Sequence, residues 1–265
     1  MVNRSTYYKF INHTPSARDK DNAYIRNCIL ALHSKYKKRL GADKLRICLR
    51  NEYCLKISTG RVYRLLKTMN LPQMSTVKPF PRKNAASSAE NCTNILKQRF
   101  NPAKPNAAWV CDMTYLRAAG RFFYLCVILD LFSRKVIAYK LARKNDSKLA
   151  LDTLTMAIQN RNINPKGIIF HSDRGAQFTS KVFRDYLDSL DMIQSFSAKG
   201  HPYDNAVMES FFKYLKKEET DRHSFASFNE LNLALFEYIH GFYNSVRPHS
   251  HNNGLSPNQA ELVFS

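Results

Sequence analysis

Apolar residues recur with helical spacing in the first part of the chain, between residues 18 and 70. The stretch AYIRNCILALHSKY places apolar side chains at Ile25, Ile29, Leu30 and Leu32, and DKLRICLRNEY and STGRVYRLLKTM follow it. Residues three and four apart lie on one face of a helix, so each stretch predicts a short amphipathic helix. The region therefore predicts three helices.

The third of these helices carries a second pattern. Ser58 is its predicted N-cap, and the face that we expect to be buried comprises Val62, Leu65 and Leu66. Basic residues recur every three positions on another face: Arg61, Arg64 and Lys67. This spacing suits the recognition helix of a helix-turn-helix domain, and we expect these three residues to contact DNA. A solvated basic face on a small helical bundle is the competing interpretation.

Residues 72–105 differ in character from the helical region before them. PQMSTVKPFPRKNAASSAE is rich in Pro, Ser, Ala and Lys and has neither helical nor strand periodicity, which predicts an extended linker. The chain thus divides into an N-terminal helical region at 1–71, a linker at 72–105 and a larger region at 106–265.

The larger region contains both strand-like and helix-like patterns. AWVCDMTYL, RFFYLCVILDLFSRKVIAYKL and KGIIFHSD are apolar, β-branched and aromatic, whereas SKLALDTLTMAIQNRN and SKVFRDYLDSLDM have helical periodicity. The predicted order is three strands, a helix, a strand, a helix, a short strand and a further helix. Such an order indicates an α/β or α+β domain with a sheet covered by helices.

Charge points to the class of partner. The formal net charge is +20 at pH 7, and residues 1–100 supply most of it, with 21 basic and 5 acidic residues. A folded core does not need this imbalance, which implies a polyanionic partner, nucleic acid above all. With 44% hydrophobic residues over 265 positions, the chain can still bury a sizeable core.

The sequence lacks the signatures of several other classes of protein. The six cysteines form no CxxC pair, which argues against a zinc knuckle and a disulfide framework. Neither a run of about 18 apolar residues nor a signal peptide occurs, so we expect a cytoplasmic protein without membrane association. No GxxxxGK[ST] phosphate loop is present, so we do not expect ATP to be required.

Three carboxylates stand out in the larger region. Asp112 lies inside the first hydrophobic strand, Asp173 follows the apolar start of KGIIFHSD, and Glu209 lies in an amphipathic helix. A buried carboxylate is costly unless it is paired or bound to a cation. Helix capping or pairing with an arginine is the competing explanation, above all for Asp173, which Arg174 and Gly175 follow.

These carboxylates fall on a strand, a strand end and a helix, and can converge. Hard cations such as Mg²⁺ take oxygen ligands, and carboxylates from different elements can hold two ions about 4 Å apart. One ion then activates an attacking water or 3′-hydroxyl while the other stabilises the leaving oxygen. The pattern therefore indicates phosphodiester chemistry.

Three motifs carry a family resemblance. WVCDMTYL, HSDRGAQFTS and GHPYDNAVMESFFKYLKKE, in this order, resemble the acidic motifs of the DDE transposases and retroviral integrases, including a 35-residue gap between the second Asp and the Glu. FYNSVRPHSHNNGLSP and MVNRSTYYKF extend the resemblance to the second-frame product, OrfB, of the IS-three family of bacterial insertion sequences. A departure is RLGADKLRICL, where the family often has a YGYRRI-like stretch.

The resemblance implies an α/β, RNase H-like core, with a mixed sheet flanked by helices, preceded by a small all-α helix-turn-helix-like domain. It implies that Asp112, Asp173 and Glu209 are the catalytic triad and ligate two Mg²⁺ ions, with Mn²⁺ as a substitute. Lys216, seven residues after Glu209 on the same helix face, matches a basic position used at the DNA end. The implied reaction is metal-dependent cleavage and strand transfer at insertion-sequence ends.

The implied partners are double-stranded DNA, as transposon ends and target, and further copies of the chain, because synapsis joins two ends. We also expect a bacterial, nucleoid-associated protein that depends on the upstream-frame (OrfA) segment, since no heptad run occurs near Met1.

More than one interpretation is open for several residues and for the function. Arg174 either contacts DNA or orders its loop, Arg247 is expected to contact phosphate, and Asp204 or Asn205 to cap the Glu209 helix. The competing functions are a catalytically silent DNA-binding accessory or regulatory protein and a metal-dependent nuclease without strand transfer.

Overall fold

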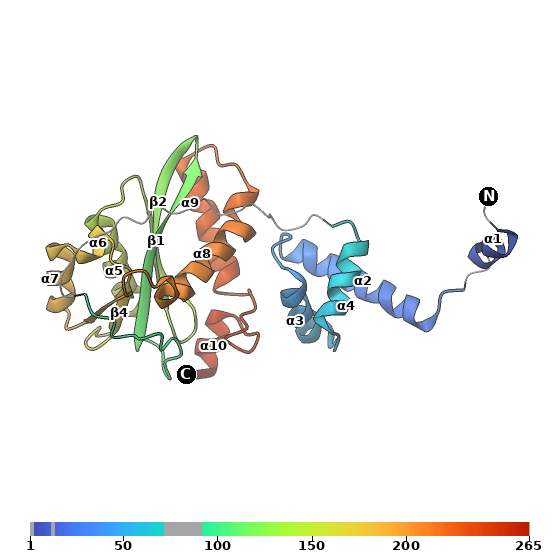
Figure 1. The fold of residues 1–265 in the computed structure, drawn as a ribbon, viewed down its shortest axis with the longest axis horizontal. Helices are drawn as coiled ribbons and strands as arrows, with labels where there is room; N and C mark the ends of the chain where they lie inside the picture. Colours follow the sequence, from blue (N-terminus) through green and yellow to red (C-terminus); the bar gives the residue numbers. More distant parts are fainter. Residues whose placement is uncertain (1–2, 12–13, 72–91, 265) are drawn as a thin grey trace. The chain divides into compact units, whose positions relative to one another are not determined.

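The computed structural model describes residues 3–11, 14–71 and 92–264. The chain separates into two compact units that divide between Met74 and Ser75 (Figure 1). Residues 72–91, which make up most of the predicted linker, lie outside the described residues.

The N-terminal unit contains a bundle of three helices preceded by a short one. Its helices are α1 (Arg4–Ile11), α2 (Ala17–Lys35), α3 (Ala42–Tyr53) and α4 (Thr59–Thr68). Helices α2, α3 and α4 pack on one another and bury a shared core that includes Ile25, Ile29, Leu45, Leu49 and Val62. The three predicted helices are confirmed, whereas α1, only eight residues long, was not predicted.

Helix α4 begins where the sequence predicts. The Ser58 hydroxyl accepts a hydrogen bond from the backbone amide of Arg61 at 3.2 Å, which satisfies one of the donors left open in a first helical turn. Val62 and Leu65 are buried, while Leu66 is only half-buried. The predicted cap is confirmed, and the buried face is slightly narrower than expected.

Five strands form one mixed sheet in the larger unit. They are β1 (Ala108–Ala118), β2 (Arg121–Asp130), β3 (Val136–Ala142), β4 (Ile169–Ser172) and β5 (Ile193–Phe196). Their order across the sheet is β3-β2-β1-β4-β5. β1, β2 and β3 form an antiparallel meander, and β4 lies parallel to both β1 and β5. Ala119 and Gly120, both with positive φ, make the two-residue turn between β1 and β2.

Helices cover both faces of this sheet (Figure 1). The first group comprises α5 (Ser147–Arg161), α6 (Ala176–Thr179) and α7 (Lys181–Ser189). After β5 the chain forms η1 (Pro202–Asn205), α8 (Ala206–Glu218), η2 (Thr220–Arg222), α9 (Phe228–Phe236), the π-helix η3 (Glu237–Tyr243) and α10 (Pro257–Phe264). Helix α5 packs on β2 and β3, and α8 packs on β1. The predicted order of strands and helices is confirmed.

The main core lies between the sheet and the α5–α7 group. It includes Trp109, Phe170, Phe178 and Phe183. Because helices cover both faces, the last six residues of β2 are all buried, which explains why its sequence is an apolar run rather than an alternation. In the part of the chain that the structure describes, no helix is long and apolar enough to span a membrane.

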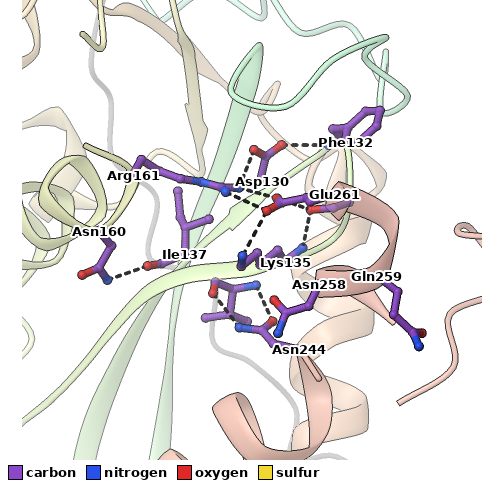
Figure 2. A network of polar contacts seen from close by, with 12 residues as sticks. Asp130, Phe132, Lys135, Ile137, Asn160, Arg161, Asn244, Asn258, Gln259 and Glu261 are labelled. Atoms are coloured by element: carbon purple, nitrogen blue, oxygen red, sulfur yellow. Dashed lines mark hydrogen bonds and ion pairs between the residues drawn. The ribbon is translucent and has the colours of Figure 1, made fainter. Parts of the chain in front are cut away.

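A polar network ties α10 to the sheet (Figure 2). Arg161, at the end of α5, places Nη2 2.8 Å from Asp130 Oδ2 and 2.6 Å from Glu261 Oε1. Lys135 Nζ lies 3.0 Å from Glu261 Oε2, and the Ser133 hydroxyl donates to Oε1 at 2.8 Å. These bonds attach α10 to the part of the larger unit formed by β2, β3 and α5.

Residues 92–98, predicted as part of the linker, bond to the sheet in the structure, and we call this segment the strap. The Ile95 and Leu96 amides donate to the Ser195 hydroxyl oxygen at 2.9 and 3.0 Å, and the Phe196 amide donates to Thr93 O at 2.9 Å. Leu96 is buried. A single anchoring leucine leaves no periodicity in the sequence, which is why the pattern suggested a linker.

Candidate active site

Two of the three predicted acidic residues lie close to the point where two neighbouring strands stop pairing. β1 and β4 run parallel, and Val110 pairs with His171. Asp112 is two residues beyond Val110 on β1, and Asp173 is two residues beyond His171, immediately after β4 ends. Paired strands lie about 4.8 Å apart, so this register brings the two backbones side by side at the end of β4.

Each of these two carboxylates accepts a local backbone hydrogen bond. Asp112, which is buried, accepts from the Met113 amide at 2.7 Å, and Asp173 accepts from the Gly175 amide at 3.0 Å. The latter bond forms an Asx turn, which gives Asp173 a local structural role in the loop that follows β4. Burial, a neighbouring thiol and the charges of both carboxylates raise the pKa of the Cys111 thiol, which places both carboxylates near one buried side chain.

The third acidic residue, Glu209, lies in the first turn of α8 and is exposed. Helix α8 packs against β1, the strand that carries Asp112. The buried face of α8 comprises Met208, Phe211, Phe212 and Leu215, so these aromatic and aliphatic side chains are core residues. Glu209 is thus carried on the outer side of a helix whose inner side is fixed by packing.

The three acidic residues have the donor chemistry for a hard cation. They offer only carboxylate oxygens, the ligand type that Mg²⁺ prefers. Among the described residues, no three His, Cys, Asp or Glu side chains are arranged so that they could hold a metal ion. Converging carboxylates repel one another unless a cation lies between them, so a ligating arrangement of Asp112, Asp173 and Glu209 requires side-chain or loop movement from this structure.

Lys216 reaches from α8 to the surface of β1. Its Nζ lies 5.0 Å from the centroid of the Tyr115 ring, within the range of a cation–π contact. Tyr115 is three residues beyond Asp112 on β1 and packs edge-on against Phe122, with ring centroids 5.3 Å apart. The ammonium group of the predicted DNA-contacting lysine therefore lies against the strand that carries the first acidic residue.

Arg174 is engaged within the protein. Its Nε donates to Ser197 O at 2.9 Å, and its Nη2 donates to Cys92 O at 3.1 Å. The first bond joins the loops that follow β4 and β5, and the second joins the loop after β4 to the strap. The geometry favours the loop-ordering alternative for Arg174 over direct contact with DNA.

The expected phosphate contact of Arg247 is not supported by its position. Arg247 is 2% exposed, and its Nε and Nη2 lie 2.8 Å from Glu218 Oε2 and Oε1. Its guanidinium also stacks on the Tyr214 ring at 4.4 Å. A buried guanidinium with both sides occupied cannot reach a DNA backbone without unfolding this region, so we assign Arg247 a structural role. The sequence motif alone did not reveal its partner, 29 residues away.

The basic residues predicted on α4 fall into two kinds. Arg64 and Lys67 are exposed, together with Tyr63. Arg61 instead joins α4 to α2, because its Nη2 lies 2.6 Å from Asp21 Oδ2 and also donates to a neighbouring asparagine. The structure thus presents Arg64 and Lys67 to solvent and uses Arg61 within the bundle.

Neither predicted cap residue caps α8. Asn205 occupies the N-cap position, but its side chain makes no cap bond, and among the described residues its buried amide has no hydrogen-bond partner. Asp204 instead accepts hydrogen bonds from Asn94, Gln98 and the Ala198 amide. The PYDN stretch suggested a helix cap. Its partners in the strap are about a hundred residues away along the chain, so the sequence did not reveal them.

Comparisons with known proteins identify the family. Two models described as Integrase core domain match residues 102–202 and 190–257, and a model described as HTH-like domain matches residues 19–80. The transposase for insertion sequence element IS904 of Lactococcus lactis subsp. lactis (strain IL1403) is 32% identical over 255 residues, which are 96% of this chain and 100% of that protein. Transposase InsF for insertion sequence IS3A of Escherichia coli (strain K12) is 35% identical over 263 residues, which are 98% of this chain and 90% of that protein. The chain belongs to the IS3 (IS-three) family of transposases.

As an IS3-family member, the chain is a DDE transposase with an RNase H-like, integrase-type core and a small helix-turn-helix-like domain. The predicted family and fold class are confirmed. Because the relatives that match nearly its whole length include transposases, the accessory-protein and nuclease alternatives are not favoured. Among solved structures, a chain of the simian T-cell lymphotropic virus intasome aligns with 87% of this chain and 73% of its own length, at 18% identity and a TM-score of 0.48.

Proposed function

We propose that this IS3-family transposase cleaves DNA at the ends of its insertion sequence and joins the exposed 3′ ends to target DNA in a metal-dependent reaction. Asp112, Asp173 and Glu209 are the proposed catalytic residues and metal ligands. The observations that support the proposal are the parallel pairing of β1 with β4, which ends at Val110 and His171, two residues before Asp112 and Asp173, and the packing of α8, the helix that carries Glu209, on β1.

Mg²⁺, with Mn²⁺ as a substitute, is the proposed cofactor, and two bound ions would supply activation of the attacking oxygen and stabilisation of the leaving oxygen. Lys216 contacts the phosphate of the DNA end about 10 Å along α8 from Glu209. ATP is not required, because transesterification conserves the phosphodiester bond.

DNA outside the active site is held by the N-terminal unit in this proposal. Arg64 and Lys67 provide exposed charge on α4, and the HTH-like match covers this helix. Arg61 and Arg174 contribute less, because their guanidinium groups already bond within the protein. The N-terminal unit then serves end recognition, and the larger unit, which includes the strap, serves the chemistry.

The working form of the enzyme is proposed to be a homo-oligomer on DNA, since two insertion-sequence ends and a target must meet. End recognition is proposed to depend partly on the upstream-frame (OrfA) segment, and the site of action is the bacterial nucleoid. A footprint on the terminal repeats by this chain alone, as tight as that of a fused OrfA–OrfB form, would refute the dependence on OrfA.

The proposal is tested by three isosteric variants: Asp112→Asn, Asp173→Asn and Glu209→Gln. Each is expected to abolish single-turnover cleavage of a labelled end duplex while end binding stays close to that of the wild type, since only the charge that ligates metal is removed. Asp188→Asn, an exposed position on α7, is the matched control. A variant that cleaves at a near-normal rate removes its residue from the triad.

A further inference from the structure

The strap contacts the residue that follows Asp173. Arg174 donates from Nη2 to Cys92 O at 3.1 Å, at the first residue of the strap, and from Nε to Ser197 O at 2.9 Å. The strap is therefore fastened to the loop of the second acidic residue and to the end of β5.

The strap also binds Asp204, five residues before Glu209. Asp204 Oδ2 accepts from Asn94 Nδ2 at 2.9 Å and from the Ala198 amide at 2.8 Å, and Oδ1 accepts from Gln98 Nε2 at 2.8 Å. Asp204 is 4% exposed. Burial alone would raise its pKa, but the bonds from Ala198 and Gln98 outweigh burial and lower it, so the carboxylate is charged and its hydrogen bonds are of the stronger, charge-assisted kind.

The start of α8 has no side-chain cap bond from its N-cap residue. Asn205, at the N-cap, makes no side-chain bond to the first turn, although such bonds normally stabilise a helix by about 1 kcal/mol. The bonds of Asp204 to the strap and to Ala198 instead hold the turn that precedes α8. Glu209 lies in the first turn of the helix that follows.

We propose that the strap braces the second and third acidic positions of the active site, and that Asp204 is a positioning residue for Glu209. The inference rests on the proposed catalytic role of Glu209. One segment, residues 92–98, holds both the residue after Asp173 and the turn before α8, and so sets the separation of two carboxylates that must share metal. A misplacement of about 1 Å in such a site can reduce the rate about 100-fold.

Asp204→Ala in the full chain removes all three bonds at once. Single-turnover cleavage at saturating end DNA is expected to fall by at least about tenfold, with an unchanged Kd for the DNA end and faster amide hydrogen exchange at residues 206–209. Asp204→Asn should retain most activity, because its carbonyl oxygen can accept from Asn94 and Ala198 while Gln98 turns its amide to accept from the new NH₂ group.

A second variant removes two of these bonds by replacing the donors in the strap instead of Asp204. Asn94→Ala with Gln98→Ala leaves residue 204 and α8 unchanged, and it is expected to reproduce the loss of rate, the unchanged Kd and the faster exchange. This double variant decides the question if Asp204→Ala does not fold. Asp188→Asn is the control, and it should match the wild type in all three measurements.

Rate and exchange at control levels in the strap variants would overturn the inference. An equal fall in rate, affinity and thermal stability would also overturn it, because that pattern indicates general destabilisation rather than positioning. If the wild type cleaves no DNA, the proposed function fails, while exchange at residues 206–209 still reports whether the strap holds α8.

Discussion

Arg247 and Glu218 form a buried, two-pronged ion pair that joins the end of α8 to the chain beyond η3, with both N–O distances at 2.8 Å. The Tyr238 hydroxyl adds a third bond to Glu218 at 2.8 Å. Arg247→Ala is expected to lower the free energy of unfolding by about 3–5 kcal/mol, because it leaves Glu218 buried without its cation. Urea denaturation measures this loss, and the DNA affinity of the folded protein should be unchanged.

Two further variants make this first prediction specific. Arg247→Lys keeps the charge but not the forked geometry, so it should recover only part of the stability. Arg247→Met combined with Glu218→Gln removes both charges and should be more stable than Arg247→Ala. An Arg247→Ala protein with wild-type stability and weakened DNA binding would restore the phosphate contact that the sequence suggested.

The Arg161–Glu261 pair predicts a pH dependence of stability. Burial alone would raise the pKa of Glu261, but Arg161, Ser133 and Lys135 outweigh it and lower the pKa to about 2, from an ordinary value of 4.5. The stabilisation, at most about 3 kcal/mol, is therefore complete above pH 4.5 and is lost as the pH falls toward 2. Burial raises the pKa of Asp130, which acts in the opposite direction.

Glu261→Gln isolates this contribution. The variant should be less stable than the wild type at pH 6, and the difference should shrink as the pH is lowered from 4.5 toward 2. Thermal unfolding at a series of pH values measures it, with Asp188→Asn as an exposed control. A difference between Glu261→Gln and wild type that stays constant over this range would show that the Glu261 charge does not stabilise α10.

The contrast between residues on α4 predicts the salt dependence of DNA binding. Arg64→Ala and Lys67→Ala should each reduce the slope of log affinity against log salt by about 1. Arg61→Ala should change the slope less and instead lower the stability of the N-terminal unit by roughly 0–1 kcal/mol, because its pair with Asp21 is partly exposed. Fluorescence anisotropy with end DNA at several salt concentrations separates the two effects, and equal slopes for all three variants would contradict the distinction.

Lys216 is expected to act in binding rather than in chemistry. Lys216→Ala should weaken binding of the DNA end while leaving the single-turnover rate at saturating DNA close to that of the wild type. Tyr115→Leu removes the ring beneath Nζ and should weaken end binding in the same direction by a smaller amount. A fall in the saturated rate of Lys216→Ala would place the lysine in the chemical step instead.

What could be predicted from the sequence depended on how local the signal was. The Ser58 cap and the order of strands and helices along the chain follow from patterns within about ten residues, and the structure confirms both. The Arg247–Glu218 pair, the bonds of Asp204 to the strap and the attachment of Glu261 to Arg161 join residues that are 29, about 110 and 100 positions apart. Single residues at such separations leave no periodicity, so the sequence suggested DNA contact for Arg247 and a linker for the strap.

Metal-dependent catalysis by Glu209 is measured in a strand-transfer assay with labelled insertion-sequence ends, target DNA and either Mg²⁺ or Mn²⁺, in which the wild-type chain is run beside Glu209→Gln. We expect joined products that require the metal and appear with the wild type alone. Joined products from Glu209→Gln, or from the wild type in the presence of a chelator, would contradict the assignment of Glu209 as a metal-binding catalytic residue.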